Sequence, residues 1–312
     1  MAFVASVVAT PAAGRLARRL GMLDRPGPFK AQREPVPYLG GLAVFVGLTV
    51  GTAAARPAFV LPFALALALG MADDRLDLAP GVRLACEVVI GVGAALVVPT
   101  GLPAPLGQLA VTSAVVVLVN AVNLIDGLDG LASGVALAGS VGFAVVLHGD
   151  DRLVASALAG ASAGFLVHNR PPASIYLGDA GAYLLGTALA LLLASAWAAG
   201  SASSAGVAAV MLVGVPLTET VVAVVRRWRN RRPLFQGDRG HVYDQLVDRG
   251  WTAGRASGAC VVAQCVLSAI AVVAAHLVPG ATVVVVATTG AAIVVIVGVG
   301  GFVAAGPRGG VT

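Results

Sequence analysis

The sequence predicts an all-α, polytopic integral membrane protein, and three observations support this fold class. First, 58% of the 312 residues are hydrophobic and the mean hydropathy is +0.92. Second, only 11% of the residues are charged, which is less than half of the roughly 25% typical of soluble domains. Third, apolar runs recur along the whole chain, with no linker, charged tail or obvious repeat between them. We therefore expect residues 1–312 to form a single transmembrane domain.

Each apolar run approaches the ~20 residues that cross a bilayer as an α-helix. The runs predict about eleven transmembrane helices, or ten if the short first run or the third run, which ends in acidic residues, does not span. The expected spans are 1–19, 38–55, 57–72, 82–99, 106–122, 130–148, 152–168, 180–198, 204–225, 257–277 and 280–304. On one side of the membrane they leave loops at about 20–37, 73–81, 123–129, 169–179 and 226–256.

The basic residues indicate the orientation, because cytoplasmic loops retain Lys and Arg. With the N-terminus outside and the C-terminus cytoplasmic, only Arg56 and Arg152 of the 20 basic residues would lie outside. The other 18 would lie on the cytoplasmic side: Arg15, Arg18, Arg19, Arg25, Lys30, Arg33, Arg75, Arg83, Arg170, Arg226, Arg227, Arg229, Arg231, Arg232, Arg239, Arg249, Arg255 and Arg308. The net charge of +5 then favours anionic lipid headgroups and a phosphorylated substrate as partners, rather than nucleic acid.

Acidic residues gather on the same predicted face. They come from three separate helix ends: Asp73, Asp74 and Asp77 after the third span, Asp126 and Asp129 after the fifth, and Asp179 after the seventh. Carboxylates brought this close repel one another unless a cation lies among them. Oxygen ligands without a Cys or His cluster favour a hard ion, and we expect Mg²⁺, with Mn²⁺ as an alternative. Asp150 and Asp151, on the outside, are expected to be ordinary solvated charges.

Each acidic cluster also has a purely structural interpretation. The first cluster could simply end a helix, and Asp126 and Asp129 could be acids favoured by a helix dipole. Asp179 could be the N-cap of the eighth span. Asn120 and Asn123, one helical turn apart, could only form hydrogen bonds between helices. The occurrence of all the clusters on one face favours a functional site.

Five segments, in order, closely resemble the polyprenyl-phosphate N-acetylhexosamine-1-phosphate transferases (glycosyltransferase family 4), which include the MraY and WecA enzymes of cell-envelope synthesis. They are DRPGPFKAQREPVPYLGG (24–41), DDRLD (73–77), NAVNLIDGLDGLASG (120–134), FLVHNRPPASIYLGDAG (165–181) and GVPLTETVVAVVRRWRNRRPLFQGDRGHVYDQLVDRGW (214–251). The resemblance covers nearly the whole chain. It implies a bacterial multi-pass protein of the cytoplasmic membrane with its active site on the cytoplasmic face.

The resemblance implies a role for each motif residue. Mg²⁺ would be held by Asp179, supported by Asp73 or Asp74. The substrate site would be lined by Asp126, which is also a catalytic candidate, and by Asn120, Asn123, Asp129 and Asn169. Lys30, Arg239 and His241 would approach phosphate groups from the first and last loops. Asp73 or Asp74 is the expected general base, and a covalent phosphoryl-aspartate remains an alternative.

The implied reaction transfers a sugar-1-phosphate from a UDP-sugar to undecaprenyl or another polyprenyl phosphate and releases UMP. The chain departs from many relatives by carrying one histidine, His241, where they carry two or three. The triple-histidine version is associated with the muramyl-pentapeptide substrate, so we expect UDP-GlcNAc as donor, with phospho-MurNAc-pentapeptide transfer as the alternative. An ion-coupled transporter is the competing class. The sequence leaves open the envelope polymer served and the oligomeric state, a homodimer included.

Two further features of the fifth segment have structural interpretations. The arginines from Arg226 to Arg232 are expected to enforce topology and touch lipid headgroups. Glu219, in the ninth span, either matches an acidic position common in WecA-like members or forms a structural hydrogen bond within the membrane.

Overall fold

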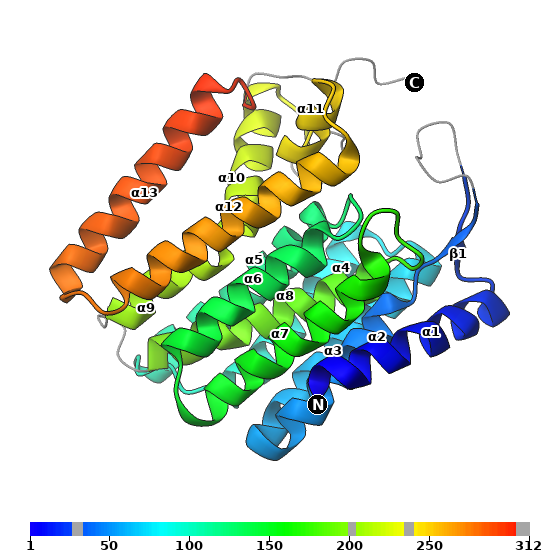
Figure 1. Cartoon of the computed structure of the whole chain (residues 1–312). Coiled ribbons are helices and arrows are strands. Elements are labelled where there is room, and N and C mark those ends of the chain that lie inside the picture. The colour runs from blue at the N-terminus through cyan, green and yellow to red at the C-terminus, as the bar shows by residue number, and fades with distance from the viewer. Residues whose placement is uncertain (27–33, 199–203, 234–239, 304–312) are drawn as a thin grey trace.

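The computed structural model describes residues 1–26, 34–198, 204–233 and 240–303, and it is almost entirely helical (Figure 1). The helices are α1 (Ala2–Leu20), α2 (Gly40–Ala55), α3 (Pro57–Leu76), α4 (Pro80–Ala95), α5 (Ala104–Ile125), α6 (Leu131–Val146), α7 (Gly149–Asn169), α8 (Gly178–Ala198), α9 (Ser204–Ala208), the 3₁₀ turn η1 (Ala209–Val213), α10 (Gly214–Arg229), α11 (Val242–Asp248), α12 (Ala253–Ala274) and α13 (Pro279–Val299). Two strands, β1 (Leu23–Asp24) and β2 (Val36–Pro37), pair antiparallel.

All eleven expected spans coincide with helices, the ninth with the consecutive elements α9, η1 and α10. Six segments of the described chain are long and apolar enough to cross a membrane: α3, α5, α8, Ser204–Arg229, α12 and α13. Helices α2 and α6 are apolar but shorter. The all-α membrane class is therefore confirmed, whereas eleven spans and their orientation stay predictions.

The helices begin and end where local chemistry favours it. Proline occupies one of the first two positions of α3, α4, α5 and α13, where its missing N–H costs no intrahelical hydrogen bond. Helix α1 ends at Gly21 in the left-handed conformation (φ 70°), whose N–H bonds the carbonyls of Ala17 and Arg18. Helix α3 extends to Leu76, so Asp73 and Asp74 lie on its last turn rather than in the expected loop.

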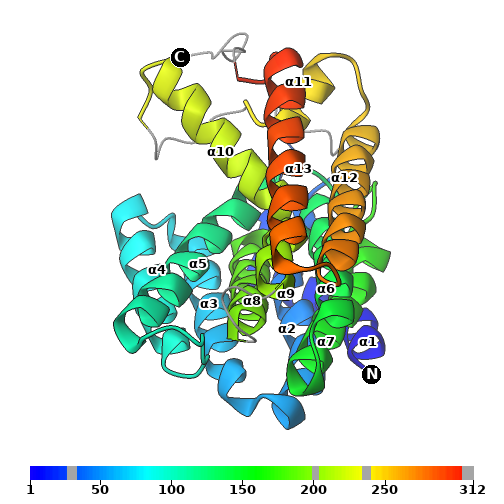
Figure 2. The same ribbon diagram turned by 90° about the vertical axis from the view of Figure 1, so that its left-hand side faces the viewer.

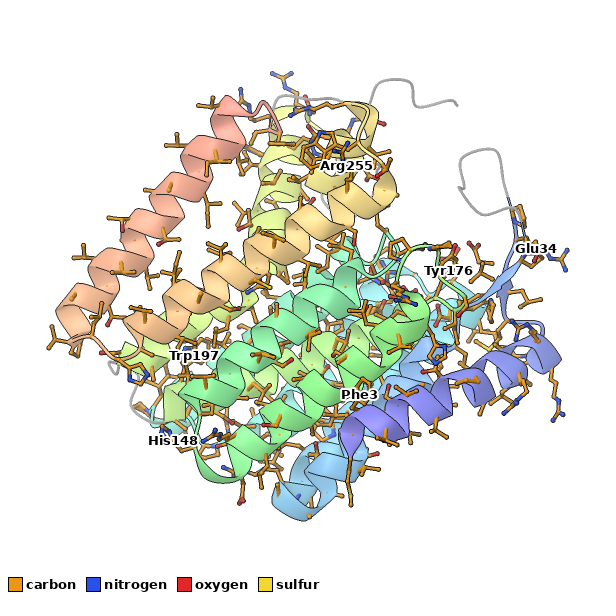
Figure 3. All side chains as sticks on the ribbon, in the orientation of Figure 1. Phe3, Glu34, His148, Tyr176, Trp197 and Arg255 are labelled. Carbon is orange, nitrogen blue, oxygen red and sulfur yellow. The ribbon has the colours of Figure 1, made fainter. Side chains whose placement is uncertain are left out.

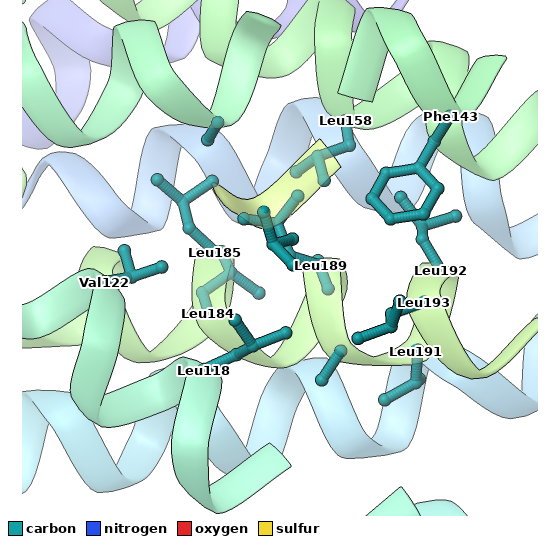
Figure 4. Packing of buried hydrophobic residues seen from close by; sticks show 14 of the residues in the cluster. Leu118, Val122, Phe143, Leu158, Leu184, Leu185, Leu189, Leu191, Leu192 and Leu193 are labelled. Atoms are coloured by element: carbon teal, nitrogen blue, oxygen red, sulfur yellow. The ribbon is translucent and has the colours of Figure 1, made fainter. Parts of the chain in front are cut away.

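Helix α8 forms the centre of the bundle. Its residues from Ala180 to Ala196 are all buried, and α2, α3, α5 and α6 pack around it. Leu118 and Val122 of α5, Phe143 of α6 and Leu158 of α7 lie beside its leucines (Figure 4). A helix that is apolar on every side is either enclosed by protein or surrounded by lipid, and α8 is enclosed. Because α8 is enclosed, its first turn, which carries Asp179, has a defined place in the bundle.

Helix α13 has the opposite environment. It packs on α9 and α12, and Figure 2 shows it running along the outside of the bundle. Thr282 is the only buried residue among Pro279–Val299. Most of its valines are exposed, as expected of a helix whose solvent is the hydrocarbon of a bilayer.

The two ends of the bundle differ in character. Figure 3 shows His148 and Trp197 at one end and Glu34, Tyr176 and Arg255 at the other. At the His148 end, Arg56 pairs with Asp151 at 2.8 Å, and Ser195 donates a hydrogen bond to the same carboxylate at 3.2 Å. The expectation that Asp151 is merely solvated was therefore wrong, because the turns before α3 and α7 bring it to an arginine.

Candidate active site

The close packing of α3 against α8 brings two aspartates together at the Tyr176 end. A Cβ atom at Gly70 would overlap the backbone of Asp179 and Ala180, so the two helices touch where only glycine fits. One turn later on α3, the Asp74 carboxylate accepts the backbone N–H groups of Asp179 at 3.0 Å and Ala180 at 3.1 Å. These N–H groups have no partner within their own helix, and an anion there is favoured by the helix dipole. Asp74, rather than Asp179, therefore caps α8.

Asp179 itself is half-buried and faces α5. Its Oδ1 accepts a hydrogen bond from the Asn123 side-chain amide at 2.7 Å. Its carboxylate also lies within hydrogen-bonding reach of the Asp73 carboxylate. Asn123 therefore orients Asp179, and two carboxylates this close repel each other unless a proton or a cation lies between them.

Asp73 has a different environment, although it is adjacent to Asp74 in the sequence. It is only 4% exposed, and its carboxylate accepts the Leu78 N–H at 2.9 Å, the Arg83 guanidinium at 3.1 Å and the Tyr183 hydroxyl. Hydrogen bonds from three donors satisfy a buried carboxylate and fix its position. Asp73 is thus an anchor that ties α3 to α4 and α8.

Asp126 follows the last turn of α5, beyond the apolar segment. No donor in the described part of the chain bonds its carboxylate, and the residue is half-buried. Burial, followed by the charges of Asp179, Asp74 and Asp129, raises the pKa of Asp126 well above its usual range. Asp126 therefore lies close enough to the other aspartates to feel their charge, and its oxygens accept no hydrogen bond from the described residues.

These carboxylates fit Mg²⁺. In the described residues, no three His, Cys, Asp or Glu side chains form a complete metal cage. Mg²⁺ does not need one, because it binds through one or two carboxylates and takes its other ligands from water and substrate phosphates. Asp179, with Asp126 nearby, matches that requirement, and a divalent cation would relieve the repulsion that adds to burial in raising the pKa of Asp126.

Two expected substrate residues hold loops together. Asn169 is 5% exposed, accepts hydrogen bonds from the Gly130 N–H at 3.1 Å and Ser133 Oγ at 2.9 Å, and donates to the Ile175 carbonyl at 3.0 Å. Asp129 accepts the Ala173 N–H at 2.9 Å. Together they fasten the segment after α7 to the turn after α5, which fixes the rim of the carboxylate site.

Asn120 points toward α4 instead of the other expected residues. Its amide donates to Glu87 Oε2 at 2.6 Å and to the Val116 carbonyl at 2.9 Å. The structural interpretation, a hydrogen bond between helices, therefore applies to it. Glu87 is 2% exposed and was missed in the sequence, although a lone acid within an apolar run is by itself a signal.

His241 is linked to the carboxylate site by Tyr243, a residue that sequence reasoning did not assign to the site. Glu219 bonds His241 Nδ1 at 2.9 Å and accepts the Val242 N–H at 2.8 Å, so its structural role is confirmed. The His241 ring stacks on Tyr243 with centroids 5.4 Å apart. Tyr243 in turn donates its hydroxyl to the Leu124 carbonyl at 3.0 Å. Burial, then the charges of Asp244, Glu219 and Asp126, raises the pKa of Tyr243, so α11 docks beside the carboxylates.

The remaining expectations concern basic residues. Lys30 and Arg239 lie outside the described residues. The expectation that the arginine run faces lipid headgroups was wrong for Arg226, which is 1% exposed, and for Arg227, which is 6% exposed. Helix α10 continues to Arg229 and turns these two side chains into the protein, so they belong to the packing of the last loop.

Comparisons with known proteins agree with these motifs. The family model for glycosyl transferase family 4 matches residues 57–197, which include all the aspartates of the site. A probable undecaprenyl-phosphate N-acetylglucosaminyl 1-phosphate transferase of Bacillus subtilis is 30% identical over 280 residues, covering 80% of this chain and 77% of the relative. The decaprenyl-phosphate N-acetylglucosaminephosphotransferase of Mycobacterium tuberculosis is 32% identical over 303 residues, covering 80% and 74%.

A more distant relative has the same kind of name. The undecaprenyl-phosphate α-N-acetylglucosaminyl 1-phosphate transferase of Escherichia coli is 25% identical over 300 residues, covering 86% of this chain and 81% of the relative. The similarity therefore extends well beyond the region that the family model matches, as the five motifs predicted. On the strength of the matched motifs, the shared length and the level of identity, the chain belongs to glycosyl transferase family 4.

Proposed function

We propose that this protein transfers N-acetylglucosamine-1-phosphate from UDP-GlcNAc to undecaprenyl phosphate or a similar polyprenyl phosphate, and releases UMP. The observation that carries the proposal is the gathering of Asp74, Asp126 and Asp179 at one end of an apolar helical bundle. The names of the relatives support the polyprenyl-phosphate acceptor and the N-acetylglucosaminyl group. The reaction would be the first membrane step in the synthesis of a cell-envelope glycan.

The site would bind the two anionic substrates with Mg²⁺ at Asp179, with Asp126 beside the cation and Asp74 holding the α8 turn beneath them. Bound Mg²⁺ supplies charge neutralisation of the diphosphate and alignment for in-line displacement. An oxygen of the lipid phosphate forms a bond to the β-phosphorus, the bond from the β-phosphorus to the oxygen that bridges the two phosphates breaks, and UMP leaves with that oxygen. His241 is proposed to approach the leaving nucleotide from the last loop.

The general base is proposed to be Asp126. The sequence favoured Asp73 or Asp74, but Asp73 accepts three hydrogen bonds and Asp74 accepts two backbone N–H groups. These hydrogen bonds occupy oxygens of both carboxylates that a base would need for the incoming proton. Asp126 has a raised pKa and no donor among the described residues, so it is the carboxylate best suited to accept the last proton of the lipid phosphate.

The carboxylate end of the bundle is proposed to face the bacterial cytoplasm. Arg15, Arg18 and Arg255 lie on helix ends near this site, whereas Arg56 and Arg152 lie at the opposite end with Asp151. This distribution supports about eleven spans in one catalytic domain, with the N-terminus outside and the C-terminus inside. Cysteine-accessibility labelling of the variants Asp150→Cys and Asp77→Cys tests this orientation. Only the cysteine at position 150 should react with an impermeant thiol reagent in intact cells.

The activity is tested by UMP release from the purified protein in detergent, with undecaprenyl phosphate, Mg²⁺ and a panel of UDP-sugars. Lipid-dependent release with UDP-GlcNAc, abolished in Asp179→Ala and kept in the exposed control Asp150→Asn, would establish the reaction. Preference for UDP-MurNAc-pentapeptide would assign the protein to the muramyl branch instead. Folded protein that releases no UMP with any sugar, with Mg²⁺ or Mn²⁺, would overturn the transferase proposal and favour the transporter.

A further inference from the structure

A second concave surface lies outside the carboxylate site, between the C-terminal half of α1 and the segment that follows α7. It consists of two adjoining hollows of about 450 and 250 Å³. The first is lined by Arg170 and Pro172, the second by Arg15 and Arg18, and both by His168 and Ser174. We call this pair of hollows the α1–α7 pocket. None of the aspartates of the active site lines this pocket.

The pocket is cationic. Arg15 and Arg18 are exposed, one turn apart on the same face of α1, and Arg170 is exposed at the end of α7. None of these three guanidinium groups pairs with a carboxylate in the part of the chain that the structure describes. The lining contains no Asp or Glu. Unpaired arginines that converge on a hollow favour a phosphate group, which they bind through paired hydrogen bonds.

A buried polar atom strengthens this interpretation. His168 Nε2 is inaccessible and has no hydrogen-bond partner in the described structure. His168 lines both hollows, and its unsatisfied nitrogen lies beneath their surface. A buried polar atom without a partner is costly, and a headgroup oxygen that drew the ring toward the hollow would lower that cost.

The surface beside the pocket is apolar, which selects a lipid over a free ion. Along α1, Val4 is 61% exposed and Val8 68% exposed, and Leu16, closer to the pocket, is 39% exposed. On α7, Val167 lines the first hollow and is 44% exposed. A ligand with a phosphate at the arginines and hydrocarbon along α1 would match both surfaces. Basic pockets between membrane helices bind anionic headgroups for this reason.

We propose that the α1–α7 pocket binds the phosphate headgroup of an anionic membrane phospholipid, and that the bound lipid stabilises the active-site rim. The rim connection is short, because Ser174 lines the pocket while the neighbouring Ala173 N–H bonds Asp129. The pocket thus lies on the outer side of the segment whose other side holds the carboxylate turn. Binding does not depend on the proposed reaction, whereas the effect on the rim, when read through activity, does.

Binding is tested by native mass spectrometry of the full chain in detergent, titrated with phosphatidylglycerol or, in a parallel arm, phosphatidylcholine. The variants are Arg15→Gln with Arg18→Gln, and Arg170→Gln. The matched control is Arg19→Gln, on the same last turn of α1 but outside the lining. We expect the affinity for phosphatidylglycerol to fall about fivefold for each pocket arginine that is replaced. Arg19→Gln should leave this affinity unchanged, and phosphatidylcholine should bind more weakly than phosphatidylglycerol. Thermal unfolding of each variant checks that it is folded.

Three results would overturn the proposal. An equal loss of affinity in Arg19→Gln would show that the lipid responds to general surface charge rather than to the pocket. Equal binding of phosphatidylcholine would show that the headgroup charge does not determine the affinity. Full competition by millimolar inorganic phosphate would identify the ligand as a free anion. In the activity arm, the double variant should lose stimulation of UMP release by phosphatidylglycerol at an unchanged KM for polyprenyl phosphate. A raised KM alone, with phosphatidylglycerol binding intact, would instead make the pocket part of the acceptor site.

Discussion

Asp74 of α3 accepts the backbone N–H of Asp179 at 3.0 Å and thereby links two motifs that lie 105 residues apart in the chain. The contact fixes the first turn of the buried helix α8 against α3. Asp179 then projects from a rigid element, with Asn123 on its other side. The arrangement separates two roles among neighbouring carboxylates, because Asp74 supports the helix and Asp179 is the one proposed to bind the cation.

Replacing the cap should therefore affect both stability and activity. Asp74→Asn keeps the shape but removes the charge and one of the two acceptor oxygens that the α8 N–H groups use. We expect a loss of about 1–2 kcal/mol in the free energy of unfolding and UMP release lowered by about 100-fold. Thermal unfolding and the UMP assay measure the two effects. The control is Asp77→Asn, at an exposed left-handed position (φ 48°) that asparagine tolerates; if it were equally impaired, the cap would not be the cause.

Replacing Asp126 should lower activity without lowering stability. Asp126→Asn removes a half-buried carboxylate that has no donor in the described chain and is repelled by its neighbours. We expect an unchanged or higher melting temperature in the absence of Mg²⁺, with UMP release lowered by about 10³-fold, within the range for loss of a general base. Asp150→Asn, exposed at the opposite end, is the control. A stable variant with near-normal UMP release would exclude Asp126 as the base.

The raised pKa of Asp126 gives the binding of Mg²⁺ a definite pH dependence. Because its folded-state pKa lies above the unfolded value, the folded protein without cation binds more protons and loses stability as pH rises through that pKa. Mg²⁺ competes with the proton, so its affinity should rise with pH and its binding should release protons.

This pH dependence can be measured as the shift in melting temperature on adding Mg²⁺ at pH 5.5 and at pH 8. The shift should be larger at pH 8, and the difference should shrink in Asp126→Asn. Removal of Mg²⁺ with a chelator should reverse the shift and stop UMP release. A shift that is equal at the two pH values would show that no carboxylate of raised pKa takes part in binding the cation.

Tyr243 should position the last loop without taking part in the chemistry. Tyr243→Phe keeps the ring that stacks on His241 but loses the hydrogen bond to the Leu124 carbonyl. We expect a loss of about 1 kcal/mol in stability and a KM for the UDP-sugar raised severalfold, with kcat less affected.

A second substitution tests the same contact from the other side. A Cβ atom at Gly127 would meet the Tyr243 ring, 2.8 Å from Cε2. Gly127→Ala should therefore reduce activity in the wild-type background and be partly rescued by Tyr243→Ala, which removes the ring. Failure of that rescue would show that Gly127 is needed for its backbone alone. Steady-state kinetics of the three variants decide between these outcomes.

Sequence reasoning succeeded where the signal is local or one-dimensional. The apolar runs predicted helices at all eleven positions, because in a bilayer a helix satisfies every backbone hydrogen bond within its own segment. The charges then indicated which helix ends share a side, and this brought Asp126 and Asp179 to one site before any contact was known. Glu87 could have been found in the same way, as an acid within the apolar run of α4.

The role of each side chain was decided by the tertiary structure alone. Asp73 and Asp74 are adjacent in the sequence, but one accepts hydrogen bonds from Arg83 and Tyr183 while the other caps α8. Tyr243 meets Leu124 across 119 residues, and Arg226 is buried where its run of charge predicted exposure. Hydrophobicity and charge determine whether a residue prefers hydrocarbon or water, and the residue types in a sequence indicate that preference directly. A hydrogen bond depends on an atom within about 3 Å, and only the packing of distant helices determines which atom that is.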